Sequence, residues 1–116
     1  MTKKRIAELY RFLSVASMKR MNEDEKVAFI RLLRTMKPVF MEVQTAMNDA
    51  IDKANSECDS EQAVVSLINK SMEDVWSEEC AVIVKTMSAD TFNRLCLSND
   101  WTFAQIDELE NELVFS

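Results

Sequence analysis

The sequence predicts an all-α protein, a single domain over residues 1–116 built as a bundle of four to five helices around one long kinked helix. Three observations lead to that fold class. Apolar residues recur at steps of three and four, the spacing of a helix face. Glycine is absent and Pro38 is the one proline, so the usual residue for tight turns is missing. Hydrophobic residues make up 47% and charged residues 29%, which is ordinary for a globular domain of this length.

Residues 3–17 form the first predicted helix, and Asn22 begins the second. The apolar side of the first helix consists of Ile6, Leu9, Tyr10, Leu13 and Ala16. Charged residues fall on its other side, as in an amphipathic helix. Asn22 followed three residues later by Glu25 is a capping-box pattern, and the acids at positions 23–25 suit the positive end of a helix dipole.

The second predicted helix runs from Asn22 to about residue 55 and contains Pro38. One apolar stripe continues along it, made of Val27, Ile30, Leu33, Met36, Phe40, Val43, Met47 and Ile51. Proline removes one intrahelical hydrogen bond and crowds the preceding turn. We therefore expect either a kink near residues 34–37 or two helices that meet there, and the continuity of the stripe favours the kink.

A third helix is predicted over about residues 60–78, with Asp59 or Ser60 as its N-cap. Its inward positions are Val64, Leu67, Ile68, Met72 (or Ser71) and Val75. The β-branched run that follows predicts one of two structures: a short strand near residues 80–85, or a continuation of this helix. A lone strand would need a pairing partner from elsewhere.

Two short helices are predicted to close the chain. Ser88 starts the first, which ends around residues 98–99, and Thr102 with Gln105 forms a second capping box. The apolar positions of the last helix are Phe103, Ile106, Leu109, Leu113 and Val114.

Trp101 lies immediately before the Thr102 cap. At that position a hydrophobic staple packs on the fourth helical residue, here Ile106. We expect the staple to pin the last helix onto the core. The alternative is that Trp101 is an exposed anchor for a partner, since tryptophan is enriched at binding hot spots.

The composition excludes several classes of site. Without glycine the chain has no phosphate-binding loop or dinucleotide fingerprint, and without histidine it lacks the commonest neutral-pH base and metal ligand. The cysteines Cys58, Cys80 and Cys96 are odd in number and widely spaced, with no CxxC pair. That pattern favours reduced, mostly buried thiols over a zinc site. We therefore expect no enzyme activity, no cofactor and no metal.

A cluster of acids is the alternative to that expectation. Glu73 and Asp74 lie close in sequence to Glu78 and Glu79 and could crowd one side of the third helix. Metal-binding carboxylates usually project into a bundle core, with histidine assisting. These acids flank solvent-facing positions, so a solvated acidic face is favoured over a carboxylate-dependent metalloenzyme.

Charge is distributed unevenly along the chain, whose net charge is −6. Residues 1–37 hold ten Lys and Arg against four acids, whereas residues 38–116 hold four against sixteen. Such a chain can neutralise itself internally, which is the default, or pair head to tail with copies of itself. It can also present a basic surface to an anionic partner. The candidate residues for that surface are Lys19, Arg20, Arg31, Arg34 and Lys37.

Three stretches at the two ends of the chain carry a resemblance. They are Ile6–Tyr10; Met21–Lys26 leading into Leu33–Val39; and Leu97–Ile106, which an acidic amphipathic helix follows. These stretches resemble a group of small, largely uncharacterised helical proteins encoded by tailed phages and prophages of gut bacteria. The resemblance implies a phage or prophage origin and a place inside a bacterial cell or a phage particle, and it transfers no functional residue.

The sequence thus predicts an accessory protein that acts by protein–protein contact, in assembly or host takeover, without chemistry of its own. A long apolar stripe with short neighbours leaves surface for a second copy, so we also expect a homodimer. The alternative is a nucleic-acid-associated protein that uses the basic first third. No segment reaches the roughly 18 apolar residues that span a bilayer, and charges interrupt the start where a secretory signal would be apolar. We therefore expect the protein to lie in the cytoplasm of the bacterial host or in the phage particle, and not to associate with a membrane.

Overall fold

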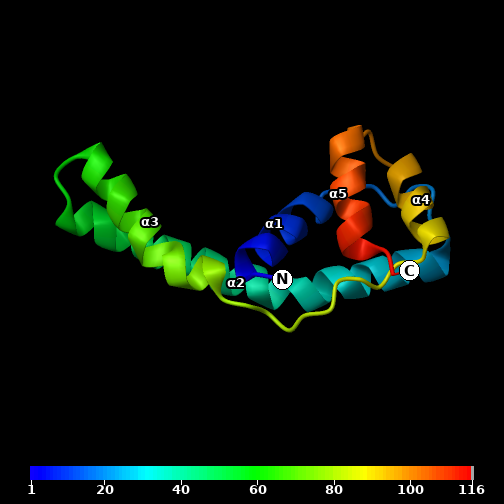
Figure 1. Ribbon diagram of the computed structural model, residues 1–116, viewed down its shortest axis with the longest axis horizontal. Helices are drawn as coiled ribbons and strands as arrows, with labels where there is room; N and C mark the ends of the chain where they lie inside the picture. Colours follow the sequence, from blue (N-terminus) through cyan, green and yellow to red (C-terminus); the bar gives the residue numbers. More distant parts are fainter. Residues whose placement is uncertain (116) are drawn as a thin grey trace. The chain divides into compact units, whose positions relative to one another are not determined.

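The computed structural model describes residues 1–115, which form five α-helices joined by turns and coil and confirm the predicted all-α fold (Figure 1). The helices are α1 (Lys3–Leu13), α2 (Glu23–Glu57), α3 (Glu61–Ser77), α4 (Ala89–Leu97) and α5 (Phe103–Leu113). None of these helices combines the length and the apolar character that crossing a membrane requires.

Four helix starts follow the predicted caps. The Asn22 Oδ1 accepts from the Glu25 N–H at 2.9 Å, and the Asn22 N–H donates to Glu25 Oε1 at 2.9 Å, which completes the capping box of α2. Ser60 and Ser88 cap α3 and α4, and Thr102 forms the second full box at the start of α5. Caps are read correctly from sequence because they depend on groups within one turn of each other.

Two helix details differ from the prediction. α1 ends at Leu13 rather than at residue 17, because the chain turns there and the Ala16 N–H bonds to the Leu13 carbonyl. Phe103 was placed on the apolar side of the last helix and is 83% exposed. Two successive steps of three separate it from the buried Leu109, which rotates it by about 120° around the helix.

α2 is one helix of 35 residues that continues through Pro38. Of the two structures expected at this proline, two separate helices are therefore wrong, and the kink stays a prediction. Just before the proline, the Thr35 hydroxyl donates to the Arg31 carbonyl at 2.9 Å.

The buried face of α2 also differs from the predicted stripe. Its members follow steps of three, four and seven: Glu25, Phe29, Leu32, Met36, Val39, Val43, Ala50 and Ala54. The predicted stripe began with three successive steps of three, and each such step rotates about 60° away from a straight face. Val27 consequently lies on another side of the helix, 48% exposed, and Ile51 is 36% exposed.

Contacts divide the chain into two compact units. The first contains residues 1–11 and 36–81, and the second contains residues 12–35 and the chain from residue 82 onward. α2 contributes to both. The single domain over residues 1–116 stays a prediction.

In the first unit, the start of the chain pairs with the segment after α3. Thr2 and Glu79 form an antiparallel bridge, and the Lys3 N–H donates to the Glu78 carbonyl at 2.9 Å. The buried cluster of this unit comprises Ala7, Val43, Ala50 and Met72, against which Phe40, Ala46, Met47, Ile68, Val75 and Trp76 pack. The inward positions predicted for the third helix agree with this cluster at Ile68, Met72 and Val75.

In the second unit, the first part of α2, residues 84–87, α4 and α5 enclose a core. Its buried residues include Phe29, Leu32, Val84, Met87, Phe92, Leu95, Leu109 and Leu113. Met87 and Val114 form a parallel bridge, in which the Met87 N–H donates to the Leu113 carbonyl at 2.9 Å. This bridge fixes the end of α5 against the segment that precedes α4.

Residues 80–86 are neither the short strand nor the helical continuation that the sequence predicted. The segment is coil between the isolated bridges at Glu79 and Met87. α3 ends at Ser77, and no neighbouring strand among the described residues pairs with the β-branched run. Val84 is buried while Ile83 is 73% exposed, so the apolar run anchors the segment by single residues.

Candidate protein-binding groove on the α2–α3 hairpin

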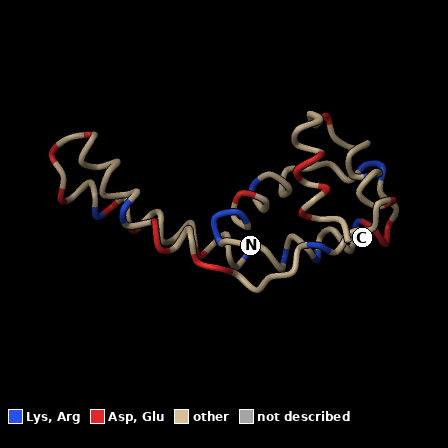
Figure 2. The backbone as a smooth tube through the Cα atoms, viewed as in Figure 1, with Lys and Arg blue, Asp and Glu red and all other residues tan. Residues whose placement is uncertain are grey.

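The five basic residues singled out from sequence are all exposed. Lys19 and Arg20 lie in the connection between α1 and α2, and Arg31, Arg34 and Lys37 lie on α2. Within residues 1–115 none of them forms an ion pair. Four belong to the second unit and Lys37 belongs to the first. Figure 2 shows basic residues along α1 and the first half of α2.

Trp101 is half-buried and packs against Phe12, with 5.2 Å between the ring centroids. The neighbouring turn is tied to the α1–α2 connection, because the Ser17 N–H donates to Asn99 Oδ1 at 2.8 Å and Asn99 Nδ2 donates to the Ser17 carbonyl at 2.9 Å. Trp101 therefore packs on the end of α1, while Asn99 holds the connection that follows. The staple on Ile106 and the role of a partner anchor both stay predictions.

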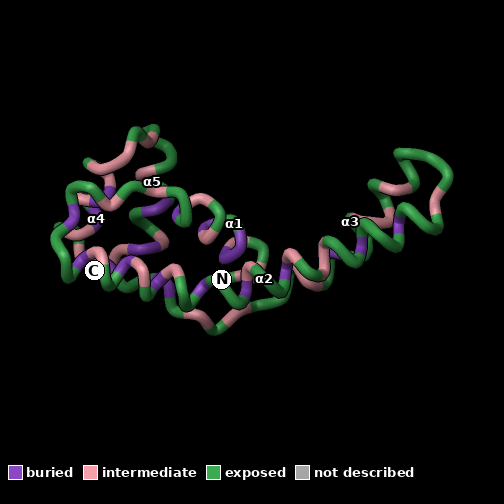
Figure 3. Tube along the Cα trace, turned by 180° about the vertical axis from the view of Figure 1, so that it is seen from behind, coloured by how far each residue is buried: buried purple, intermediate pink, exposed green. Residues whose placement is uncertain are grey.

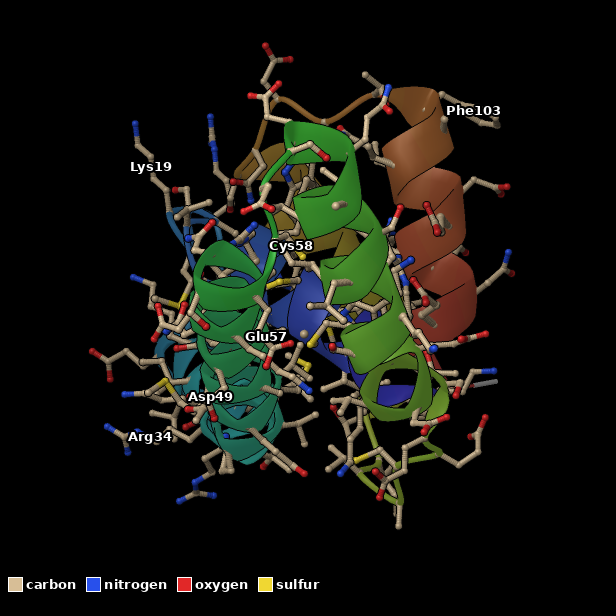
Figure 4. The ribbon with its side chains drawn as sticks, turned by 90° about the vertical axis from the view of Figure 1, so that its left-hand side faces the viewer. Lys19, Arg34, Asp49, Glu57, Cys58 and Phe103 are labelled. Carbon is tan, nitrogen blue, oxygen red and sulfur yellow. The ribbon has the colours of Figure 1, made fainter. Side chains whose placement is uncertain are left out.

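The three cysteines are free and half-buried rather than mostly buried. Burial raises the pKa of the Cys96 thiol, and the charge of Glu110 raises it further. A raised pKa leaves little thiolate at neutral pH, and the thiolate is the nucleophilic form. Cys58 lies at the connection between α2 and α3, as Figure 4 shows.

The acids considered as a metal site serve other contacts or face solvent. Glu73, Asp74, Glu78 and Glu79 are all exposed. Glu78 pairs with Lys3 Nζ at 3.1 Å. In the part of the chain that the structure describes, no group of three or more Cys, Asp and Glu side chains is placed to hold a metal ion.

Glu25 is a buried carboxylate in the second unit, 7% exposed. It accepts from Arg94 Nε at 2.7 Å, from Arg94 Nη2 at 2.6 Å and from the Thr91 hydroxyl at 2.7 Å. The hydrogen bonds from Arg94 lower the pKa of Glu25 to about 2, against the opposing effect of burial. Every acceptor is thus satisfied within the fold, so this cluster is structural rather than a reactive carboxylate.

The base of the α2–α3 hairpin (residues 36–77 of α2 and α3 with their connection) is organised by α1. Lys3 Nζ bonds to Glu42 Oε1 at 2.6 Å and to Glu78 Oε1 at 3.1 Å, and these contacts raise the pKa of Lys3. Along the same helix, Tyr10 packs on Phe40 with 4.8 Å between ring centroids. α1 thereby lies across the two hairpin helices at their base.

Trp76 forms the centre of this base. The Lys4 ammonium lies 5.2 Å from the centroid of the Trp76 ring, within the range of a cation–π contact. A hollow of about 350 Å³ opens beside the ring, lined by Lys4, Ala7, Glu8, Arg11, Phe40, Val43, Gln44, Met47 and Trp76. A second hollow borders the other side of Trp76, lined by Thr2, Lys4, Asn69, Lys70, Glu73 and Ser77.

The base hollow continues along one face of the hairpin. On α2, Gln44, Asn48, Ile51 and Asn55 follow the spacing i, i+4, i+7, i+11 and so share one side of the helix. On α3, the matching side carries Gln62, Val65, Asn69 and Trp76. At the tip the two helices meet again in a hollow lined by residues that include Asn55, Cys58, Gln62 and Val65. We call this surface, from Trp76 to Cys58, the hairpin groove.

Between its two end hollows, the hairpin groove is apolar at its centre and has an uncharged rim. Charged residues line the hollows themselves, among them Lys4 at the base and Asp59 at the tip. Met47 is half-buried, Ile51 is 36% exposed and Val65 is 56% exposed. The rim consists of the neutral side chains Gln44, Asn48, Asn55, Gln62 and Asn69. Asp49 and Lys53 lie two residues before and after Ile51, and so project from another side of α2. Depletion of charge around an apolar centre is typical of protein interfaces.

Sequence reasoning missed this groove because it assigned Phe40, Met47 and Ile51 to the buried stripe of α2. The apolar residues of α3 gave one signal that could have found it. They spread from Leu67 to Trp76 around about half of the helix circumference, more than one neighbouring helix can cover. Excess apolar width of this kind indicates a surface for a further element.

No protein-family model, curated protein or solved structure matches this chain.

Proposed function

We propose that this protein is an accessory protein that acts by binding another protein chain in the hairpin groove, without chemistry of its own. The observation that carries the proposal is the groove itself: Ile51 and Val65 are partly exposed on the side of the hairpin that carries the base and tip hollows, and neutral amide side chains border them. Apolar surface of this kind, bordered by polar side chains, fits the apolar side of an incoming helix. A homodimer is one assembly that such a groove allows.

The proposal includes a phage or prophage origin, with the protein acting in the bacterial cytoplasm or in the phage particle. Its support is the resemblance of Ile6–Tyr10, Met21–Lys26 and Leu97–Ile106 to the phage-encoded helical proteins. The process would be assembly or host takeover. Capsid and tail genes beside the coding gene would favour assembly.

A photo-crosslinking amino acid at position 44 should capture a protein chain in the bacterial cells where the gene is expressed. Gln44 lines the base hollow, so a chain bound in the groove comes within reach of its side chain. The measurement is gel analysis of the irradiated cells, followed by mass spectrometry of the crosslinked band.

The matched control is the same amino acid at Asp49, which is exposed on another side of α2 (Figure 4). We expect no specific band from position 49. Equal crosslinking from both positions, or none from position 44, would remove the groove as the binding site.

Nucleic-acid association is the second candidate function, and one observation favours it. Lys19, Arg20, Arg31, Arg34 and Lys37 are exposed and have no acid partner within residues 1–115. Their charge is therefore available to phosphates.

If this second function holds, affinity for duplex DNA should fall roughly twentyfold when the salt concentration doubles, because five phosphate contacts would release their counterions. Arg31→Glu with Arg34→Glu should abolish the binding, since both side chains are exposed. Fluorescence anisotropy with mixed-sequence DNA and RNA measures both effects. Glu23→Gln, a charge change in the first turn of α2, is the control. Absence of binding at low salt would eliminate this candidate.

A further inference from the structure

We propose that the hairpin groove is occupied by the same groove of a second copy, so that two α2–α3 hairpins form an antiparallel four-helix bundle. This inference rests on the proposed protein-binding role of the groove and names its occupant. In a dimer with two-fold symmetry, the same surface of both copies forms the interface. The groove must therefore be complementary to itself in polarity, in charge and in packing.

The polarity of the rim meets this requirement. Gln44, Asn48, Asn55, Gln62 and Asn69 all end in amides. An amide carries both donors and an acceptor, so identical amides can satisfy one another across a two-fold axis. Gln44 and Asn48 already do so within one chain, with Gln44 Nε2 donating to Asn48 Oδ1 at 3.3 Å. A rim of acids would repel its own copy, whereas an amide rim does not.

Charge at the two ends of the groove sets the direction of pairing. The charged residues that line the tip hollow are both acids, Asp59 and Glu61. The hollows at the base are lined by three cations and two acids: Lys4, Arg11, Lys70, Glu8 and Glu73. Tip-to-tip pairing would bring four like charges together. Antiparallel pairing places the acids of each tip beside the other base, where cations outnumber acids, which is favourable.

Packing gives the third argument. Beyond Val43 the buried positions of α2 are the small residues Ala50 and Ala54, so the part of the hairpin toward the tip buries little apolar area by itself. Figure 3 shows that exposed positions predominate toward the tip. A second hairpin packed on the groove would cover Ile51 and Val65 near the two-fold axis. The two hairpins together would then form the four-helix bundle.

The purified protein should therefore have twice the 13.4 kDa chain mass in sedimentation equilibrium at micromolar concentration. Ile51→Lys with Val65→Lys should raise the dissociation constant by at least about tenfold, because charges replace the centre of the interface. Both residues are already partly exposed, so the helical circular dichroism should not change. Val27→Lys is the matched control: Val27 is 48% exposed on α2 and belongs to the second unit, outside the hairpin.

Disulfide trapping tests the direction of pairing. In a variant with Cys58 as the one cysteine, oxidation should yield no covalent dimer, because antiparallel pairing separates the two tips. Adding Ser77→Cys at the base should yield a covalent dimer. The two thiols cannot close within one chain, since the 17 residues of α3 separate them by about 26 Å.

A monomer at near-millimolar concentration, a dimer that withstands the double lysine substitution, or rapid trapping through Cys58 alone would each overturn this pairing. If position 44 still crosslinks to a different protein, these results would rule out the dimer but would leave the proposed binding role intact. Conversely, crosslinking from position 44 to the chain itself supports both proposals. Loss of that crosslink in the Ile51→Lys, Val65→Lys variant would confirm the shared surface.

Discussion

Replacement of Phe29 by alanine should lower the free energy of unfolding by about 3–5 kcal/mol. Phe29 is 2% exposed and belongs to the largest fully buried side chains of the second unit. Truncation removes the transfer free energy of the ring and leaves a cavity that the surrounding helices fill only in part. Urea denaturation followed by circular dichroism measures the effect through the midpoint and slope of the transition.

Val27→Ala is the control for this prediction, because Val27 lies two residues earlier on α2 and is 48% exposed. Its cost should stay within about 0.5 kcal/mol, as for most surface substitutions. The reverse order, with Val27→Ala costing more than Phe29→Ala, would show that the apolar stripe read from sequence is the true buried face.

Glu25→Ala should destabilise the protein by about 3 kcal/mol at neutral pH, since hydrogen bonds to charged groups contribute more than neutral ones and their unpaired partners lose solvation. The carboxylate accepts from Arg94 and Thr91, and it also accepts from the Asn22 N–H in the cap of α2. Its removal leaves all three donors without this acceptor. Thermal and urea unfolding of the variant at pH 7 measure the loss.

The same contact makes stability depend on pH in the acid range. The pKa of Glu25 is about 2 in the folded protein, against an ordinary value of 4.5, because Arg94 favours the ionised form. A lowered folded pKa means that the unfolded chain binds the proton more tightly. This contribution to stability is therefore complete above pH 4.5 and is lost as the pH falls from 4.5 to about 2.

Glu25→Gln separates this contribution from the other acids. The glutamine keeps an oxygen for the Asn22 N–H but has no charge to titrate. The difference in unfolding free energy between the natural protein and this variant should be constant above pH 4.5 and shrink below it. A difference that does not change down to pH 2 would mean that Arg94 does not hold the carboxylate ionised.

The parts of the fold that depend on near neighbours in sequence were predictable. The caps at Asn22, Ser88 and Thr102 were read correctly because donor and acceptor lie three residues apart. The coil at residues 80–86 was not, because a β-branched run becomes a strand only where another strand is available. The buried face of α2 was misjudged at Val27 for a related reason: several helix sides carry apolar residues, and tertiary contacts decide which one is covered.

The candidate groove depends on long-range contacts and could not be predicted in the same way. Trp76 reaches Lys4 because the start of the chain pairs with residues after α3, and no local pattern reports that pairing. Sequence reasoning instead selected basic residues such as Arg31, which are conspicuous by charge. Trp101 was selected by its position before a cap and packs on Phe12, 89 positions away in the sequence.

The division of the chain has a consequence for the order of folding. Each unit combines two stretches separated by the stretch of the other, and the bond between Thr91 and Glu25 spans 66 residues. Closing such loops costs chain entropy before any contact compensates for it, which slows folding relative to a bundle with neighbouring contacts. During synthesis, residues 1–11 must leave the ribosome and wait for residues 36–81, and residues 12–35 must wait for α4 and α5. Their apolar faces are exposed during that interval, when chaperones would have access to them.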